Sequence, residues 1–302
     1  MRTRTMELAD LIEPDAQLRR LGEGYQFTEG PVWVAAEQCL EFVDIPSDTR
    51  WRWTEERGME ISLQPMFKAS GLALDREGRI VACEGLSSCV ARFENGRREV
   101  IAYHYRGSYL NSPNDLVTRR LDGSIYFTDP DYGRWNDWIG QERNRDNLGY
   151  RGVYRIAPDG ELHLVVDKDE FDQPNGIAFS PDETLLYVND SSLRNVKVFD
   201  VAPDGSLSNG RVFASEIGSG VPREGNVDGM ECDEHGNVWV TGPGGVWVLT
   251  PDGVHLGTVK TPEVCGSLAW GGEDMHSLFL MTSTTVHVVR TLVGPPPLPG
   301  AP

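Results

Sequence analysis

The sequence predicts an all-β fold, namely a six-bladed β-propeller with four antiparallel strands in each blade and a ring closed by an N-terminal strand. Short apolar runs with strand-type alternation follow one another along the chain, and the one short stretch with helical spacing lies near Met6–Leu11. A unit of four such runs, separated by turn residues, recurs six times at a period typical of propellers. The sixth unit lacks its last strand, while a strand-like segment without a partner precedes the first unit.

The clearest copy of the repeating unit spans residues 175–214. It reads as the strands GIAFS, LLYVND, VKVFDV and SLSNGRVFA, with turn residues between them. The same order returns, with varying completeness, in copies that begin at Glu29, Ser70, Asn114, Asp228 and Cys265. Asp-Gly and Asn-Gly pairs fall between the strands, where glycine supplies the positive φ that tight hairpins need. The Pro-Asp-Gly triplets that begin at Pro158, Pro203 and Pro251 are therefore predicted to be structural turns.

The two ends of the chain supply the closure of the ring. The sixth copy ends after its third strand, TVHVVR at residues 285–290, where a tail rich in proline and glycine begins. We expect the segment Gln17–Phe27 to be the missing fourth strand, because closure removes the exposed edges that an open sheet would leave. The predicted organisation is therefore one domain over residues 17–292, with an N-terminal extension at 1–16 and a Pro-rich tail at 293–302.

Composition excludes several classes of partner. The chain has 302 residues and a formal net charge of −18, which would repel a phosphate backbone, so no nucleic-acid partner is expected. No apolar stretch approaches the roughly 20 residues that span a bilayer, so no membrane role is expected either. The N-terminal residues have no apolar core of signal-peptide length, which favours a cytoplasmic location. The oligomeric state stays open at this stage.

The cysteines indicate neither a disulfide framework nor a zinc site. Their number is odd and no CxxC spacing occurs, so we expect them to be buried apolar fillers. The five are Cys39, Cys83, Cys89, Cys232 and Cys265.

The propeller register predicts a ring of polar residues around the axis. The first strand of every blade lines the central channel, so residues at the same register position face one another across it. This ring consists of Glu29, Ser70, Asn114, Asn175, Asp228 and Cys265. In five of the six copies a glycine follows the ring residue closely, which would let the inner strands approach one another near the axis.

The charge of this ring indicates a divalent cation. Glu29 and Asp228 would repel each other in a confined space, so either one takes up a proton or a cation lies between them. Asn114 and Asn175 add neutral oxygens, and an all-oxygen donor set favours Ca²⁺, then Mg²⁺ or Mn²⁺, over Zn²⁺. The alternative is that these polar side chains only hydrate the channel and cap strand ends.

Antiparallel alternation brings further residues to the same face of the propeller. The ends of the second strands carry Asp44, Glu84, Asp129 and Asp190, which are expected to surround the mouth of the channel. The longest insertion, residues 130–150, also lies on this face, and its aromatic residues suit a wall or lid for a hydroxylated substrate. Asp129, Tyr132 and His104 are therefore candidate substrate-binding residues, although His104 and Arg223 also read as ordinary exposed loop residues.

Five motifs together resemble the family of gluconolactonases and senescence-marker-protein-30-like lactonases. The motifs are EGPVW at 29–33, SPNDL at 112–116, YFTDPDYG at 126–133, QPNGIAFSPDE at 173–183 and VDGMECDEHGNVWV at 227–240. Each is weak alone, but their order is specific and the match runs from about residue 20 to 290. The resemblance implies a six-bladed propeller that holds one divalent cation at the channel mouth.

Carried over by motif, the implied cation ligands are Glu29, Asn175 and Asp228, with Asn114 beside the metal or on the substrate. The implied acid/base residue is Asp228. One departure stands out, because animal members have an arginine two positions before the asparagine of the second motif, where this chain has Ser112. The grip on the substrate must then come from elsewhere, and exact lactone specificity stays open.

The expected function is therefore metal-dependent hydrolysis of a sugar lactone, such as glucono-1,5-lactone, to the aldonic acid, which is a step of carbohydrate metabolism. A second hypothesis keeps the hydrolase but changes the substrate to another lactone, an aryl ester or a phosphotriester, since fold and metal do not fix the leaving group. A third hypothesis is a non-catalytic propeller that binds a protein or a carbohydrate.

Overall fold

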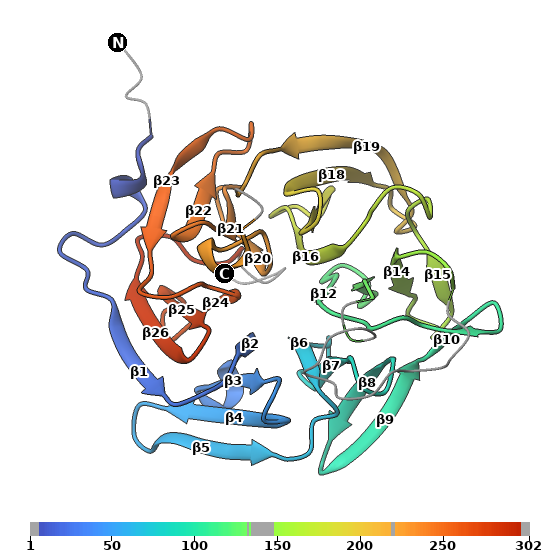
Figure 1. Ribbon diagram of the computed structural model, residues 1–302, viewed down its shortest axis with the longest axis horizontal. Helices are drawn as coiled ribbons and strands as arrows, with labels where there is room; N and C mark the ends of the chain where they lie inside the picture. Colours follow the sequence, from blue (N-terminus) through green and yellow to red (C-terminus); the bar gives the residue numbers. More distant parts are fainter. Residues whose placement is uncertain (1–5, 132, 134–147, 219–220, 297–302) are drawn as a thin grey trace.

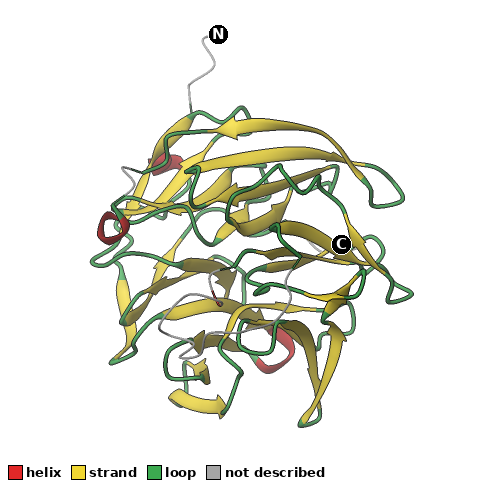
Figure 2. Ribbon diagram, turned by 45° about the vertical axis from the view of Figure 1, so that its right-hand side comes forward, coloured by secondary structure: helices red, strands yellow, loops and turns green. Residues whose placement is uncertain are grey.

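The computed structural model of the chain describes residues 6–131, 133, 148–218 and 221–296. Six four-stranded antiparallel sheets stand as blades around a central axis (Figure 1). Within this part of the chain, strands form nearly all of the regular structure (Figure 2). The exceptions are the short 3-10 helices η1 (Leu8–Asp10), η2 (Ala35–Glu37) and η3 (Pro222–Glu224). The predicted six-bladed propeller is confirmed.

The first three blades follow one another along the chain. Blade 1 contains β2 (Thr28–Val34), β3 (Cys39–Asp44), β4 (Thr49–Thr54) and β5 (Gly58–Leu63). Blade 2 contains β6 (Ala69–Leu74), β7 (Ile80–Glu84), β8 (Cys89–Glu94) and β9 (Arg97–Ala102). A small hairpin of β10 (His104–Tyr105) and β11 (Ser108–Tyr109) follows. Blade 3 contains β12 (Leu116–Thr118), β13 (Ile125–Asp129), β14 (Gly152–Ile156) and β15 (Leu162–Leu164).

The other three blades complete the ring. Blade 4 contains β16 (Pro174–Phe179), β17 (Leu185–Asp190), β18 (Asn195–Val201) and β19 (Leu207–Ala214). Blade 5 contains β20 (Met230–Cys232), β21 (Val238–Gly242), β22 (Gly245–Leu249) and β23 (His255–Lys260). Blade 6 contains β24 (Ser267–Gly271), β25 (Ser277–Thr282), β26 (Thr285–Arg290) and, as its outer strand, β1 (Arg19–Glu23).

The N-terminal strand closes the ring as predicted. β1 pairs antiparallel with β26, so the two ends of the chain share one blade (Figure 1). The packed structure extends beyond the expected limits of 17 and 292 on both sides. Leu11 and Val293 are each 2% exposed and belong to one hydrophobic cluster, and Ile12 forms a β-bridge with Thr291. Most of the predicted N-terminal extension and the start of the predicted tail are therefore part of the domain.

The inner strands lie close together because glycine follows the ring residues. A Cβ added at Gly30 would overlap the carbonyl oxygen of Ser70, and one added at Gly176 would overlap that of Asp228. Backbone hydrogen bonds join neighbouring blades at the same level, as between the Gly71 amide and the Asn114 carbonyl at 2.7 Å. This close approach narrows the axis and brings the ring residues of adjacent blades together.

Aromatic and aliphatic side chains fill the space between blades. Trp33 of blade 1 stacks on Phe279 of blade 6, with ring centroids 5.6 Å apart, and Tyr126 of blade 3 packs edge-on against Phe179 of blade 4. All five cysteines are buried and free, as expected. No helix among the described residues is long and apolar enough to cross a membrane.

Candidate active site

All six residues of the predicted ring line a single cavity of about 510 Å³. The ring residues are Glu29, Ser70, Asn114, Asn175, Asp228 and Cys265, one from each blade. In blades 1, 2 and 4 the ring residue belongs to the inner strand, whereas in blades 3, 5 and 6 it lies just before it. A volume of this size falls within the range of small-molecule sites in proteins, which is roughly 300–1,000 Å³.

Glu29 presents an unpartnered carboxylate oxygen in this cavity. The side chain is 5% exposed, and its Oε2 accepts a hydrogen bond from the Gly30 amide at 3.1 Å. Its Oε1 is buried and has no hydrogen-bond partner. Burial and the neighbouring Asp228 carboxylate raise the pKa of Glu29 well above its ordinary value, because both disfavour the ionised form.

Asn175 is held so that its carbonyl oxygen is also left without a partner. Its Nδ2 donates to the Ser191 hydroxyl at 3.0 Å, and that hydroxyl donates in turn to the Val227 carbonyl at 2.7 Å. Because this chain of hydrogen bonds engages the amide nitrogen, the Oδ1 is the free end of the side chain, and it is buried without a hydrogen-bond partner. Asn175 is therefore a potential oxygen ligand in the cavity.

Asp228 is positioned through its backbone by blade 4. Asn189 donates from Nδ2 to the Asp228 carbonyl at 2.6 Å and accepts from the Gly176 amide at 3.2 Å, so one buried amide ties two inner strands together. Burial, and then the charge of Asp115, raise the pKa of the Asp228 carboxyl to about 7. Asn114, the remaining predicted donor, is fixed by a hydrogen bond from its amide to the Thr128 carbonyl at 2.9 Å.

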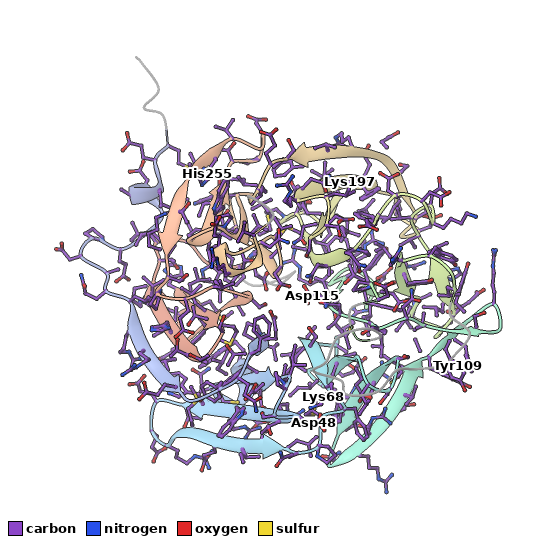
Figure 3. The ribbon with its side chains drawn as sticks, viewed as in Figure 1. Asp48, Lys68, Tyr109, Asp115, Lys197 and His255 are labelled. Carbon is purple, nitrogen blue, oxygen red and sulfur yellow. The ribbon has the colours of Figure 1, made fainter. Side chains whose placement is uncertain are left out.

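Further carboxylates lie along the axis beyond the ring residues. Asp115 accepts hydrogen bonds from the Leu116 and Ile177 amides and lies near the centre of the propeller (Figure 3). Burial raises its pKa to about 7, and burial together with Asp115 raises the pKa of Glu231 to about 8. The interior of the channel therefore contains several carboxyl groups whose burial favours the protonated form.

The donor set of the cavity fits a hard divalent cation. Two buried oxygens, Glu29 Oε1 and Asn175 Oδ1, accept no hydrogen bond from a described residue, and leaving such atoms unpaired costs about 1–3 kcal/mol each. Both side chains interact directly with the Asp228 carboxyl group, so the three lie together. Cys265 contributes no thiolate, because burial raises the pKa of its thiol. Among the described residues no group of three or more His, Cys, Asp or Glu side chains is placed to hold a metal. The candidate set instead combines two carboxylates with two amides, which suits Ca²⁺ better than Zn²⁺.

The carboxylates at the ends of second strands play a different part from the one predicted. Asp44, Asp129 and Asp190 are buried, and each accepts hydrogen bonds from the amides two and three positions before a ring residue. They thereby fix the backbone that leads into Glu29, Asn114 and Asn175. Glu84 instead binds the Arg98 guanidinium. None of the four is among the described residues that line the cavity.

Of the predicted substrate-binding residues, Asn114 lines the cavity, whereas Asp129 and His104 are not among the described residues that line it. Asp129 is fully buried, with its oxygens on the Asn111 and Ser112 amides at 2.9 and 2.8 Å, so it positions the connection to Asn114. His104 packs on Tyr109, which lies at the outer rim (Figure 3). Tyr132 lies outside the described residues, as does most of the 130–150 insertion, which connects β13 to β14 as expected.

Several residues that line the cavity were not singled out from the sequence. Ser191, Asn226 and Lys68 are among them, and Ser191 orients Asn175. Ser191 directly follows the end of a second strand, and Lys68 and Asn226 each lie two positions before a ring residue. The register that predicted the ring therefore contained a signal for them, because residues at these positions share the same face.

Comparison of the sequence with known proteins identifies the family of this chain. The family model described as "SMP-30/Gluconolactonase/LRE-like region" matches residues 27–284, from the first inner strand to the start of β26. A gluconolactonase from Zymomonas mobilis is 31% identical over 93% of this chain and 83% of its own length. A regucalcin from Pongo abelii is 30% identical over 86% of this chain and 84% of its own length.

A solved gluconolactonase structure has the same fold. The gluconolactonase of Xanthomonas campestris superposes with a TM-score of 0.85 and 32% identity, covering 94% of this chain and 92% of that chain. The family match contains every ring residue and the inner strand of each of the six blades. The chain belongs to the SMP-30/gluconolactonase/LRE-like family.

Proposed function

We propose that this chain hydrolyses a sugar lactone of the glucono-1,5-lactone type to the aldonic acid, and that it does so with one divalent cation held by Glu29, Asn175, Asp228 and Asn114. The observation that carries the proposal is the pair of buried oxygens without partners, Glu29 Oε1 and Asn175 Oδ1, in a cavity that also contains Asp228. A cation there would satisfy both oxygens and offset the repulsion between the two acids.

The reaction class rests on the relatives. At the level of lactone hydrolysis, the chain is a lactonase, since it matches gluconolactonases at 31% and 32% identity over more than nine-tenths of its length. The glucono-lactone and the need for a cation are the finer parts of the proposal. The all-oxygen donor set supports Ca²⁺ first, with Mg²⁺, Mn²⁺ and Zn²⁺ as alternatives that the experiment below separates.

When bound, a divalent cation supplies Lewis-acid polarisation of the lactone carbonyl. The cavity residues supply the rest. The amide side chains of Asn175 and Asn114 do not titrate, so they can bind and orient a ligand but do not transfer protons. Phe27, Ile45 and Val264 give the cavity apolar walls, which limit the water around the reacting ester.

Asp228 is the group proposed to move the proton. Its carboxylate accepts a proton from the attacking water as the new C–O bond forms, and it returns that proton to the ring oxygen as the ester bond breaks. A pKa near the working pH suits both transfers, and burial holds the pKa of Asp228 at about 7 when no cation is present. Because a nearby cation lowers that pKa and so weakens the base, ligation is the competing role for Asp228. Asp129 is the alternative proton carrier that the sequence offers, but its oxygens accept from the Asn111 and Ser112 amides and it is not among the described residues that line the cavity, which favours Asp228.

The test is hydrolysis of glucono-1,5-lactone in weak buffer, followed by acid release, before and after chelation. We expect activity to disappear on chelation and to return with one divalent metal added at a time. Asp228→Asn should abolish turnover, and Glu29→Gln should first raise the metal concentration needed for half activity. Asp252→Asn, a change in an exposed turn, is the matched control for the loss of one carboxylate.

The outcomes separate the parts of the proposal. Full activity after exhaustive chelation would reject the cation. Near-wild-type turnover by Asp228→Asn with metal bound would reject its role in proton transfer. A panel that includes an aryl ester and a phosphotriester tests the substrate, and faster turnover of either would reject the sugar lactone.

A further inference from the structure

The neutral polar groups at the rim of the cavity are already engaged within the protein. The Ser112 hydroxyl accepts from the Gly133 amide at 3.0 Å, and the Ser283 hydroxyl donates to the Val264 carbonyl at 2.9 Å. Asn226 donates to the Ser191 carbonyl at 2.7 Å and accepts from the Val227 amide at 2.9 Å. The Ser112 O–H and one N–H of Asn226 remain as donors, but these neutral groups cannot balance a negative charge on a substrate.

Two positively charged side chains at the rim, unlike the neutral groups, have donors left for a ligand. Lys68 and Arg223 are the only positively charged side chains among the described residues that line the cavity. The Lys68 ammonium donates to the Pro46 carbonyl at 2.8 Å, which leaves two of its three N–H groups. Neither side chain forms a salt bridge with a described carboxylate, although most other arginines of this acidic chain do.

Lys68 is held in place by its backbone. Phe67 and Lys68 both have left-handed backbone conformations, with φ of 56° and 53°. The Asp48 carboxylate accepts from the Lys68 amide at 2.6 Å, and the Lys68 carbonyl accepts from the Gly85 amide at 3.2 Å (Figure 3). Conformations that cost energy persist where the surroundings enforce them, and they are common where a side chain has to be aimed at a ligand.

The register places Lys68 and Arg223 on opposite sides of the mouth. Lys68 lies two positions before the ring residue Ser70, at the entrance to blade 2. Arg223 lies in η3, in the connection that leads into blade 5. In a ring of six blades, the second and fifth face each other across the axis (Figure 1). A substrate above the ring residues would therefore have one cation on each side.

We propose that the natural substrate is a sugar lactone that carries an acidic group, either a carboxylate or a phosphate, away from the ester, and that Lys68 binds this group. Lys68 is the specificity residue because it is partly buried and fixed, whereas Arg223 is exposed and adds a weaker attraction. The inference rests on the proposed lactone hydrolysis and names the substrate class of that same cavity.

The net charge of −18 does not oppose this assignment. Charges separated by more than about 8 Å are largely screened at physiological ionic strength, so groups close to the substrate dominate its binding. Lys68 lines the cavity itself, and the acids that line it, Glu29 and Asp228, are the ones proposed to be neutralised by the cation.

The experiment compares kcat/KM for three lactones: a neutral aldonolactone, an aldarolactone with a free carboxylate, and an aldonolactone phosphate. Wild-type protein should prefer one acidic lactone to the neutral one by about ten- to a hundredfold, which is the worth of one charge-assisted hydrogen bond. Which acidic lactone is preferred tells carboxylate from phosphate. Lys68→Met should lose this preference while retaining turnover of the neutral lactone, and Lys68→Arg should restore part of it. Arg97→Met removes a positive charge from the start of an outer strand at the opposite face, so it is the matched control.

Each outcome decides a separate point. If no lactone is turned over, the proposed function itself fails. If the neutral lactone is turned over as fast as both acidic ones by wild-type protein, this inference alone fails, and no variant needs to fold for that result. An acid preference that survives unchanged in Lys68→Met would also overturn the assignment. Retention of the wild-type unfolding midpoint by Lys68→Met excludes a merely structural effect.

Discussion

Replacement of Asp228 by asparagine should stabilise the metal-free protein relative to wild type by an amount that grows as the pH rises from about 4 to about 7. The pKa of Asp228 rises from its ordinary value of 3.8 to about 7 in the folded protein, because burial and the charge of Asp115 disfavour the carboxylate. A carboxyl whose folded pKa is raised contributes most below its unfolded pKa, and that contribution is lost as the pH rises to the folded pKa. An amide has the same shape and does not titrate.

The magnitude follows from the pKa. Each pH unit between the ordinary pKa of 3.8 and the folded pKa of about 7 removes about 1.4 kcal/mol from the free energy of unfolding of the wild-type chain. Of this loss, about 2 kcal/mol falls between about pH 5.5 and about pH 7. Above pH 7 both states are ionised and the loss stops. Water reaches Asp228 through the cavity that it lines, so this figure is an upper limit. Removal of the charge also lowers the pKa of Glu29, since Asp228 is one of the groups that raise it, and this effect has the same sign.

The assay is urea unfolding with chelator present, followed by tryptophan fluorescence, at about pH 5.5 and about pH 8.5. Asp228→Asn should gain up to about 2 kcal/mol on wild type between the two pH values, while the exposed-turn control Asp252→Asn should follow wild type. Parallel pH dependence of Asp228→Asn and wild type would refute the reasoning, because it would mean that the Asp228 carboxyl is not desolvated.

Three other predictions follow from the same geometry. Ca²⁺ at a hundred times its dissociation constant for wild type should raise the free energy of unfolding of wild type by about 2.7 kcal/mol. The same Ca²⁺ concentration should stabilise Glu29→Gln much less, and equal stabilisation of both would show that Glu29 is not a ligand. Gly176→Ala should lower lactone turnover without removing the β-type circular dichroism spectrum, because the added Cβ overlaps the Asp228 carbonyl; an unchanged rate would show that the inner strands can separate. Asp190→Ala should cost at least about 3 kcal/mol in urea unfolding, because it leaves the Asp172 and Gln173 amides without their acceptor; a loss below about 1 kcal/mol would contradict that role.

The sequence by itself determined the architecture of this protein. Strand alternation and turn residues are local signals, and their sixfold recurrence, together with an incomplete last unit, required a closed ring. Once the ring is closed, residues at the same register position of different blades lie at the same level along the axis and face one another across it. For this reason Glu29, Asn114, Asn175 and Asp228 could be brought to one cavity without knowledge of any contact.

Only the tertiary structure decided which of the polar groups are free. Asp129 and Glu29 are both acids at strand ends. The oxygens of Asp129 accept hydrogen bonds from two loop amides, whereas one oxygen of Glu29 has no hydrogen-bond partner. The Lys68 ammonium has N–H groups left because, within the described part of the chain, it donates to a carbonyl and forms no salt bridge with a carboxylate. Such outcomes depend on how connections between blades fold over the ends of strands, and these connections carry no repeating pattern. The period of a strand fixes the direction of a side chain, but hydrogen bonds between segments distant in sequence fix what that side chain has left to bind.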